Sequence, residues 1–379
     1  MRPLTVVQLL PALESGGVER STIEICDALV RVGHRAIVVS AGGRLLPALT
    51  ATGAEHIALG IGRKSVATLR HVHALRRLFE TTRPDIVHAR SRLPAWIGWW
   101  ALRGMDRATR PHFVTTVHGI NSPSRYSAIM ARGERVICVS ATVRQYVLQH
   151  YPTTDAARLR VIPRGIDPAA FPQLPWPDVS ARARANAAHP QLEGAGPLLL
   201  LPGRGTRLKG HGDALTLLAA LRGDGTDARL WMPGAREVAR AEYIAELEAT
   251  AAALGVADAV AITPPTASIA EAYAASDLVL QLSRKPESFG RTVIEALAVG
   301  RPVLGWAHGG VGELLQGLQP QGAVAPFDSE ALARTARVLL AQGPALAVTM
   351  PAMLQEYSLR AMQDATLACY AEFAHDRGR

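Results

Sequence analysis

Residues 286–297 read Pro-Glu-Ser-Phe-Gly-Arg-Thr-Val-Ile-Glu-Ala-Leu, so two carboxylates stand eight positions apart across a Phe-Gly turn. The turn feeds an apolar helical run. A helix start presents unpaired backbone N–H groups and the positive end of the helix dipole, which suits an anion. At roughly 3.6 residues per turn, Glu295 lies about two turns into this helix while Glu287 stays in the loop. Glutamate near a helix start is also ordinary capping chemistry, so the stretch alone leaves a ligand site and a capped helix both open.

A second glycine loop follows the apolar, strand-like run at residues 197–202. The loop, residues 203–211, reads Gly-Arg-Gly-Thr-Arg-Leu-Lys-Gly-His. Its glycines allow a close approach of the backbone, and Arg204 and Lys209 can reach one anion from two sides. The loop does not fit the P-loop pattern, because no Gly-Lys-Ser/Thr follows the strand. A solvated basic loop remains the alternative interpretation.

The N-terminal region repeats this pattern of strand, glycine loop and helix. Residues 6–10 are strand-like, Gly16 and Gly17 form the loop, and an amphipathic run continues to position 32. The loop lacks the G-x-G-x-x-G fingerprint of dinucleotide-binding proteins, which counts against an oxidoreductase. A plain tight turn is the alternative for the two glycines.

Short apolar runs alternate with helical patterns along almost the whole chain, which indicates repeated βαβ units and parallel sheets covered on both faces. We expect strands near 4–10, 35–40, 55–59, 85–89, 112–117, 135–139 and 159–162, and again near 197–201, 228–232, 259–262, 277–282, 302–305 and 323–325. Prolines at 168, 172, 175 and 177 interrupt the pattern. We therefore predict an α/β protein with an N-terminal domain at 1–170, a linker at 171–196, a C-terminal domain at 197–357 and a terminal helix at 358–379.

Length and composition fit two globular domains with hydrophobic cores, because the 379 residues are 48% hydrophobic and only 19% charged. No apolar run reaches the roughly 18–20 residues that span a bilayer, and the start of the chain lacks the pattern of a signal peptide. The three cysteines are scattered, which indicates a reducing cytoplasm, and no metal-ligand spacing is present.

The net charge of +9 is unevenly placed: residues 1–172 carry +12 and residues 173–379 carry −3. A basic half implies an anionic partner such as a membrane surface or a phosphorylated glycolipid, while an arginine-rich coding bias is the alternative. We expect a helix over 65–81 with Leu69, Val72, Leu75 and Phe79 on one packed stripe and Arg70, His73 and Arg77 on another, preceded by Arg63 and Lys64. This helix is either a docking face for an anionic bilayer or a solvated basic face. Nucleic acid is not expected, because no recognition module appears.

Taken together, the motifs resemble a family 4 retaining glycosyltransferase of the GT-B fold, of the lipopolysaccharide-core or polysaccharide type. The ordered set that carries the resemblance consists of Gly16-Gly17, Val117-His118-Gly119, residues 161–167 (Val-Ile-Pro-Arg-Gly-Ile-Asp), Gly203-Arg204 with Lys209-Gly210, and the two-glutamate stretch. The set spans residues 5 to about 315. Two positions depart from the family pattern: Arg164 stands where asparagine is common, and Ser288 stands where the family often has glycine.

The resemblance implies two Rossmann-like, doubly wound domains facing across a cleft, with the terminal helix crossing back to the first domain. It also implies site residues. The catalytic residues are His118, Arg204, Lys209 and Glu287; the donor is held by Gly16, Gly17, Arg204, Lys209, Glu287, Ser288, Phe289, Gly290 and Glu295; and His88 and Arg90 line the acceptor side. In this assignment Glu295 accepts hydrogen bonds from the ribose and Glu287 from a hydroxyl of the transferred sugar. Asp277 is expected in a turn or cap.

The function implied is transfer of a hexose-type unit, with retention, from a nucleotide sugar that is most simply UDP-linked. Fixed cations at Arg204 and Lys209, together with the absence of an Asp-x-Asp triad, predict that no metal or other cofactor is needed. The expected acceptor is a lipopolysaccharide core or another lipid-linked glycan. The expected location is the cytoplasm, with peripheral contact at the inner face of the membrane. Alternatives are soluble synthesis of a small glycoside on a sugar or sugar phosphate, and a nucleotide-sugar-binding protein without turnover.

Overall fold

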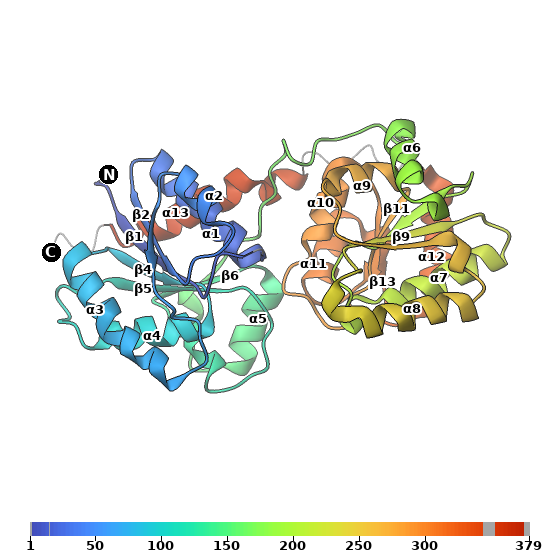
Figure 1. The fold of residues 1–379 in the computed structure, drawn as a ribbon. Coiled ribbons are helices and arrows are strands. Elements are labelled where there is room, and N and C mark those ends of the chain that lie inside the picture. Colours follow the sequence, from blue (N-terminus) through green and yellow to red (C-terminus); the bar gives the residue numbers. More distant parts are fainter. Residues whose placement is uncertain (1, 15, 344–352, 375–379) are drawn as a thin grey trace. The chain divides into compact units, whose positions relative to one another are not determined.

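The structure, a computed structural model, describes residues 2–14, 16–343 and 353–374. The chain forms two compact units, each shown as an α/β body in Figure 1. Unit 1 comprises Met1–Gly165 and Leu359–Arg379, and unit 2 comprises Ile166–Ser358. The chain therefore passes twice between the units, at positions 165–166 and 358–359.

Unit 1 contains a seven-stranded, wholly parallel sheet with the strand order β3-β2-β1-β4-β5-β6-β7. The strands are β1 (Thr5–Leu9), β2 (Arg35–Ser40), β3 (Glu55–Ala58), β4 (Ile86–Ala89), β5 (His112–Val117), β6 (Arg135–Cys138) and β7 (Leu159–Val161). The order reverses between β1 and β4, as in doubly wound folds, and the central strands are buried on both faces.

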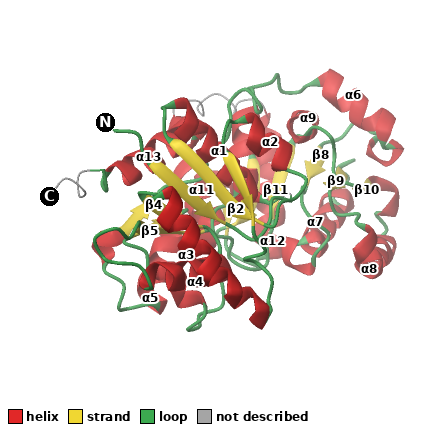
Figure 2. Cartoon of the chain, turned by 60° about the vertical axis from the view of Figure 1, so that its left-hand side comes forward, coloured by secondary structure: helices red, strands yellow, loops and turns green. Residues whose placement is uncertain are grey.

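The helices of unit 1 cover both faces of this sheet (Figures 1 and 2). They are α1 (Gly17–Arg31), α2 (Leu46–Ala51), α3 (His71–Thr82), α4 (Arg92–Arg103), α5 (Ala141–His150) and α13 (Leu359–Ala371), with the 3₁₀ turns η1 (Val66–Arg70), η2 (Ser127–Ala131) and η3 (Ala156–Arg158). α1, α2 and α13 share one apolar core cluster with the sheet. Figures 1 and 2 both show α3 and α4 side by side.

Unit 2 repeats the plan with a six-stranded parallel sheet of order β10-β9-β8-β11-β12-β13. The strands are β8 (Leu198–Leu200), β9 (Arg229–Pro233), β10 (Val260–Thr263), β11 (Leu278–Gln281), β12 (Val303–Trp306) and β13 (Ala323–Val324). Its order reverses between β8 and β11. The sequence prediction of two doubly wound, parallel-sheet domains is thus confirmed, with every predicted strand present within about two residues at either end.

Seven α-helices belong to the described part of unit 2. They are α6 (Val179–Ala188), α7 (His211–Gly223), α8 (Ala241–Ala253), α9 (Ile269–Ala275), α10 (Arg291–Val299), α11 (Gly309–Leu318) and α12 (Ser329–Gln342), with 3₁₀ turns η4 (Pro190–Leu192), η5 (Arg207–Lys209), η6 (Val238–Arg240), η7 (Ala257–Ala259), η8 (Pro320–Gly322) and η10 (Met353–Tyr357). α7, α8 and α12 build one core cluster with the strands of the sheet.

The terminal helix α13 packs in unit 1. Met362, Cys369 and Tyr370 are buried in the same core cluster as α1, and Gln363 donates to the Glu24 carbonyl of α1 at 2.7 Å. The Tyr370 hydroxyl reaches the ring of His88 on β4 at 2.6 Å. Positions 375–379 of the helix predicted at 358–379 lie outside the described residues.

The predicted linker at 171–196 contains a helix that sequence analysis did not expect. α6 lies inside this range and packs against α9. Its apolar pattern is weak, because only the small side chains of Ala181 and Ala185 are buried. The available signal was Asp178, whose carboxylate accepts a hydrogen bond from the Ala181 N–H at 2.9 Å and caps the helix.

The proline-rich segment before α6 is fixed to unit 2 by the buried Arg301. Its guanidinium donates to the carbonyls of Leu174 and Pro175, and also to those of Ala274 and Ser276. Burial lowers the pKa of Arg301 to about 10. The segment is therefore an ordered part of unit 2 rather than a free connection.

The helix predicted over 65–81 is also corrected. The structure has the 3₁₀ turn η1 followed by α3, and η1 is capped by Ser65, whose hydroxyl accepts from the Ala67 N–H. Leu69 was expected on the packed stripe, but 48% of its surface is exposed. The change from 3₁₀ to α geometry breaks the 3.6-residue period on which the predicted stripe rested.

Across the residues that the structure describes, none of the helices combines the length and the apolar character needed to cross a membrane.

Candidate active site

In unit 2 the expected donor residues fall at the point where the strand order reverses. The loop after β8 carries Arg204 and Lys209, and the loop after β11 carries Glu287. Loops at such a switch point leave a crevice at the carboxyl ends of the strands, which is where doubly wound sheets bind ligands. Arg204 is exposed on this loop, and the Lys209 side chain is 30% exposed.

Gly210 lets these two loops approach each other. Its φ is +76°, and a Cβ built there would lie 2.0 Å from the Leu282 carbonyl oxygen. Only glycine fits such a contact, because a side chain would collide with the backbone of the neighbouring loop. The glycine after Lys209 therefore brings that lysine toward the residues after β11.

The Glu287 carboxylate accepts a hydrogen bond from the Lys209 ammonium at 2.6 Å. This ion pair joins two residues that are 78 positions apart in the sequence. The Ser283 hydroxyl and the Gln281 amide also donate to this carboxylate. The three donors fix its position at the switch point. The Lys209 ammonium can therefore bind a phosphate of a ligand while the neighbouring Glu287 carboxylate accepts a hydrogen bond from a sugar hydroxyl of the same ligand.

Glu295, on α10, is held by one donor from α9 and by one donor from the first turn of α10. Its carboxylate accepts from the Tyr273 hydroxyl at 3.0 Å and from Arg291 at 3.2 Å. Burial and the nearby Glu295 charge raise the pKa of Tyr273 well above its usual range, so the phenol stays protonated and keeps donating. The Glu295 side chain is 14% exposed, which leaves it room to accept from a ligand hydroxyl.

Ser288, Phe289 and Gly290 form the turn between these two glutamates. Gly290 has φ +109° and is the N-cap of α10. Phe289 is 5% exposed and its ring packs near Tyr357, so this residue belongs to the packed interior of the turn. Ser288 is half-buried beside it.

Sequence analysis missed a second glycine turn that supports this region. The N–H of Gly310, in the first turn of α11, donates to the Glu287 carbonyl at 2.7 Å, and a Cβ on Gly310 would lie 2.5 Å from Phe289. His308, before this helix, contacts the Ser283 carbonyl at 2.7 Å. The signal was present as His-Gly-Gly after the strand predicted at 302–305, which is the same pattern of strand, glycine and helix.

In unit 1, His118 follows β5 and contacts Arg164, the residue that departs from the family pattern. The guanidinium lies 2.6 Å from Nδ1 of the ring. Arginine has only donors, so Nδ1 accepts, and in the neutral ring the proton is on Nε2. Burial lowers the pKa of His118 well below 6.5, and the charge of Arg164 lowers it further. His118 is thereby set up as a neutral hydrogen-bond donor through Nε2.

We predict that ¹⁵N NMR of the histidine-labelled protein shows His118 neutral at pH 6, with its proton on Nε2. Arg164→Met removes the donor to Nδ1, so the tautomer preference should weaken and the pKa of His118 should rise toward 6.5. Arg164→Asn, which restores a donor, should retain more of the Nε2–H form. A wild-type ring protonated on Nδ1, or an unchanged spectrum in Arg164→Met, would contradict the assignment.

His88 and Arg90, expected on the acceptor side, are inside the fold. His88 is fully buried, with Nδ1 at 2.6 Å from the Tyr370 hydroxyl and Nε2 at 2.6 Å from the Thr116 hydroxyl. Both ring nitrogens are therefore engaged, so His88 is corrected to a structural role. Arg90 is only 5% exposed and donates to the Ser21 hydroxyl at 3.2 Å.

Gly16 and Gly17 begin α1 at the switch point of unit 1, although Ser15 beside them lies outside the described residues. Gly16 is the N-cap, and a Cβ there would meet the Glu19 carboxylate at 2.2 Å. Gly17 has no atom near its missing Cβ. The first turn of the helix thus has its own carboxylate, and an anion at Gly16 must displace the Glu19 side chain.

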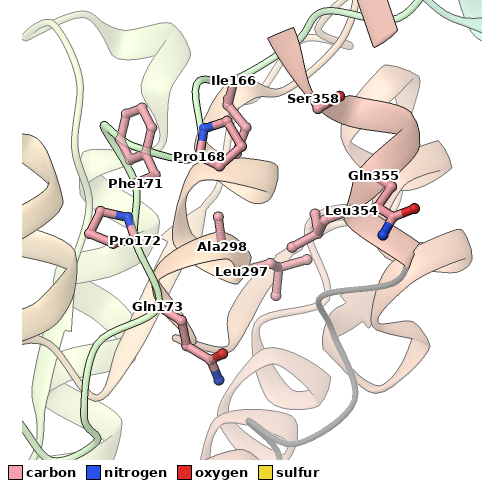
Figure 3. Close-up of a pocket in the computed structure, with 10 residues that line it drawn as sticks. All are labelled: Ile166, Pro168, Phe171, Pro172, Gln173, Leu297, Ala298, Leu354, Gln355 and Ser358. Carbon is pink, nitrogen blue, oxygen red and sulfur yellow. The ribbon is translucent and has the colours of Figure 1, made fainter. Parts of the chain in front are cut away.

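A separate apolar pocket of about 250 Å³ lies where the chain enters and leaves unit 2 (Figure 3). It is lined by Ile166, Pro168, Phe171, Pro172, Gln173, Leu297, Ala298, Leu354, Gln355 and Ser358. These described lining residues include no charged side chain and none of the expected site residues. The pocket does not suit a diphosphate, and we do not assign it to the site.

With this geometry established, comparison with known proteins identifies the group to which the chain belongs. Residues 15–170 match Glycosyltransferase Family 4, and residues 184–358 match glycosyl transferases group 1. A glycosyltransferase from Rickettsia africae has the same fold with a TM-score of 0.86 and 27% identity, over 99% of this chain and 100% of that one. The chain belongs to the GT-B glycosyltransferases.

Two further proteins are similar to this chain. HepE from Anabaena, in a complex with UDP and glucose, shares the GT-B fold with a TM-score of 0.79 at 20% identity, over 97% of this chain and 99% of HepE. A D-inositol 3-phosphate glycosyltransferase from Geodermatophilus obscurus is 28% identical over 250 residues, which cover 60% of this chain and 53% of that protein. The alignment thus spans about half the length of this relative.

Proposed function

We propose that this GT-B glycosyltransferase moves a hexose-type unit from a UDP-sugar to a small phosphorylated acceptor, with retention of the anomeric configuration and without a metal ion. The observation that carries the proposal is the contact between Lys209 and Glu287 at the switch point of unit 2. It puts a cation suited to phosphate next to a carboxylate suited to a sugar hydroxyl.

The donor chemistry explains why a fixed cation is needed. Transfer breaks the bond between the anomeric carbon and the phosphate oxygen, and the departing nucleoside diphosphate gains negative charge. Lys209 and Arg204 would stabilise this charge more strongly than that of the intact donor, which lowers the barrier. Glu295 would hold the ribose, and the N-terminus of α10 would face the phosphates.

Retention follows from attack on the same face of the sugar. The acceptor oxygen would bond to the anomeric carbon as the phosphate oxygen leaves, and the acceptor proton would pass to that departing oxygen. Glu287 is engaged by Lys209, Ser283 and Gln281, which suits a hydrogen-bond acceptor better than a nucleophile. His118 would contribute a neutral donor through Nε2.

The relatives support a phosphorylated small acceptor rather than the lipid-linked glycan that sequence analysis preferred. The similar protein from Geodermatophilus obscurus carries the name D-inositol 3-phosphate glycosyltransferase. The surplus of positive charge in residues 1–172 is compatible with a phosphorylated acceptor as well as with a lipid. We therefore place the small phosphorylated acceptor first.

Two assays in sequence test the identity of the donor, the identity of the acceptor and the requirement for a metal ion. Thermal shifts with UDP-, GDP- and ADP-glucose rank the donors, and transfer to inositol 3-phosphate is then followed in excess EDTA. We expect the largest shift with the UDP-sugar and undiminished transfer in EDTA. Complete loss restored only by added metal would refute metal independence, and transfer to a lipid-linked glycan but not to inositol 3-phosphate would refute the small acceptor.

A further inference from the structure

Three tryptophans lie on the part of α4 in unit 1 that does not face the core, between Arg92 and Arg103 at the two ends of the helix. The inward face consists of Pro94, Ala95, Ile97, Gly98, Ala101 and Leu102, all buried. Trp96, Trp99 and Trp100 lie outside this buried face, at the i, i+3, i+4 spacing that places side chains on one side of a helix. We term these three residues the tryptophan face. Trp100 is 37% exposed, and the other two rings are partly exposed. Half of the six tryptophans of the chain thus lie on one helix turn at the surface.

The rings are ordered by one another and by arginines. Trp96 lies 5.5 Å from Trp99 and 5.2 Å from Trp100, measured between ring centroids. The Arg132 guanidinium lies over both Trp96 and Trp99, at 5.5 and 5.2 Å, and Arg103 lies over Trp99 at 4.7 Å. The Trp96 indole N–H donates to the Tyr126 carbonyl at 2.9 Å. The face is therefore an organised surface of indoles and guanidiniums.

The segment of the chain that contains this face is strongly basic. Residues 59–133 contain thirteen Lys and Arg but only three Asp and Glu. The net charge of this segment, 13 − 3 = +10, therefore exceeds the net charge of +9 of the complete sequence. The segment includes α3, which packs beside α4 and whose Arg76 donates to the Ala101 carbonyl. A depression of about 530 Å³ adjoins Trp99 and is lined by Arg132 and Arg158 along with Asp155.

We propose that the tryptophan face docks this protein on an anionic lipid surface. Indole rings are amphipathic and favour the boundary between headgroups and acyl chains, while arginine keeps its guanidinium at the level of the phosphates. Indoles flanked by Arg92 and Arg103 on one helix provide both contacts, and the surrounding charge complements an anionic leaflet. The inference does not depend on the proposed reaction.

This surface differs from the docking face expected from sequence. The expected face lay on residues 65–81 and relied on charge alone. In the structure α4 adds apolar rings next to that basic region, so docking gains a component that salt does not screen. The protein should consequently remain partly bound to anionic vesicles at physiological salt, whereas a purely basic face would release.

The test uses the full chain with vesicles of phosphatidylcholine alone or mixed with phosphatidylglycerol. We expect co-sedimentation with the anionic vesicles only, together with quenching of tryptophan fluorescence by brominated lipid. Trp96→Gln with Trp100→Gln should weaken binding roughly tenfold or more. Arg103→Ser with Arg132→Ser should weaken it about thirtyfold at low salt, from roughly 1 kcal/mol per basic residue. The matched control, Val179→Gln with Val238→Gln, removes two exposed apolar side chains of unit 2 and should bind normally.

Several outcomes would overturn the proposal. The proposal is refuted if the wild type does not bind anionic vesicles or binds neutral vesicles equally well. It is also refuted if the tryptophan variant binds anionic vesicles as tightly as the wild type. A concentration-dependent dimer in light scattering that the tryptophan variant lacks, without vesicle binding, would assign the face to a protein contact instead. If the double variant fails to fold by circular dichroism, Trp100→Gln alone and the brominated-lipid quenching of the wild type decide the question.

Discussion

Replacing Lys209 with alanine should lower the turnover of sugar transfer by about 10²-fold or more, the loss typical when a donor to developing negative charge is removed. Lys209 contacts Glu287 at 2.6 Å, so the variant removes the cation and also frees the carboxylate that the lysine holds. Initial rates measured over a range of donor concentrations separate the two effects: loss of phosphate stabilisation lowers kcat, while misplacement of Glu287 raises KM for the sugar nucleotide.

A matched control exists in the neighbouring loop. Lys285 follows β11 as well, is exposed, and lies two positions before Glu287. Lys285→Ala should leave the rate within about twofold, because an exposed surface charge contributes little. Lys209→Arg keeps the charge but not the compact ammonium, and we expect an intermediate rate. Wild-type turnover in Lys209→Ala would remove this lysine from the proposed mechanism.

The second large effect is expected at Glu295. A carboxylate that accepts hydrogen bonds from two ribose hydroxyls contributes roughly 1.5–3 kcal/mol per charge-assisted bond, so Glu295→Ala should weaken UDP binding by about tenfold or more. Isothermal titration with UDP measures the difference directly. Equal affinities in the two proteins would refute the ribose assignment.

Glu295 also accepts from Tyr273 and Arg291, so the loss of affinity must be separated from a loss of stability. Tyr273→Phe removes one of these internal donors and keeps the carboxylate, and we expect UDP affinity within a few-fold of the wild type. Glu330→Ala changes an exposed glutamate of α12 and should alter neither property. Comparable weakening by Tyr273→Phe and Glu295→Ala would point to general loosening of α10 rather than to a ribose contact.

The two sheets and the loops that carry the candidate site could be predicted from sequence patterns alone. Strand and helix periods are local, and each depends on residues within a few positions of one another, so alternation between them predicts parallel sheets without tertiary information. The glycines that follow the strand at 197–202, and the glycine that precedes Glu295, are likewise local features, and they indicated the loops at the switch point. The strand order then follows from the doubly wound plan.

Where local patterns were weak or mixed, sequence analysis was wrong. α6 buries little beyond Ala181 and Ala185, so no apolar stripe announced it among the prolines. The stretch expected as one helix over 65–81 changes geometry at residue 70, which shifts Leu69 to the surface. In both places the outcome depends on what the segment packs against, and the period of the segment itself does not contain that information.

Which side chains meet one another depends on how the whole chain folds. Lys209 and Glu287 are 78 positions apart and His118 and Arg164 are 46 apart, and their contacts depend on how loops from different strands approach. His88 looked like a strand-end ligand until the ring proved enclosed by Tyr370 from the far end of the chain. The tryptophan face likewise could be identified only from the structure, which shows that the opposite side of α4 is buried. The exposure of a side chain depends on the packed fold and not on the residue type.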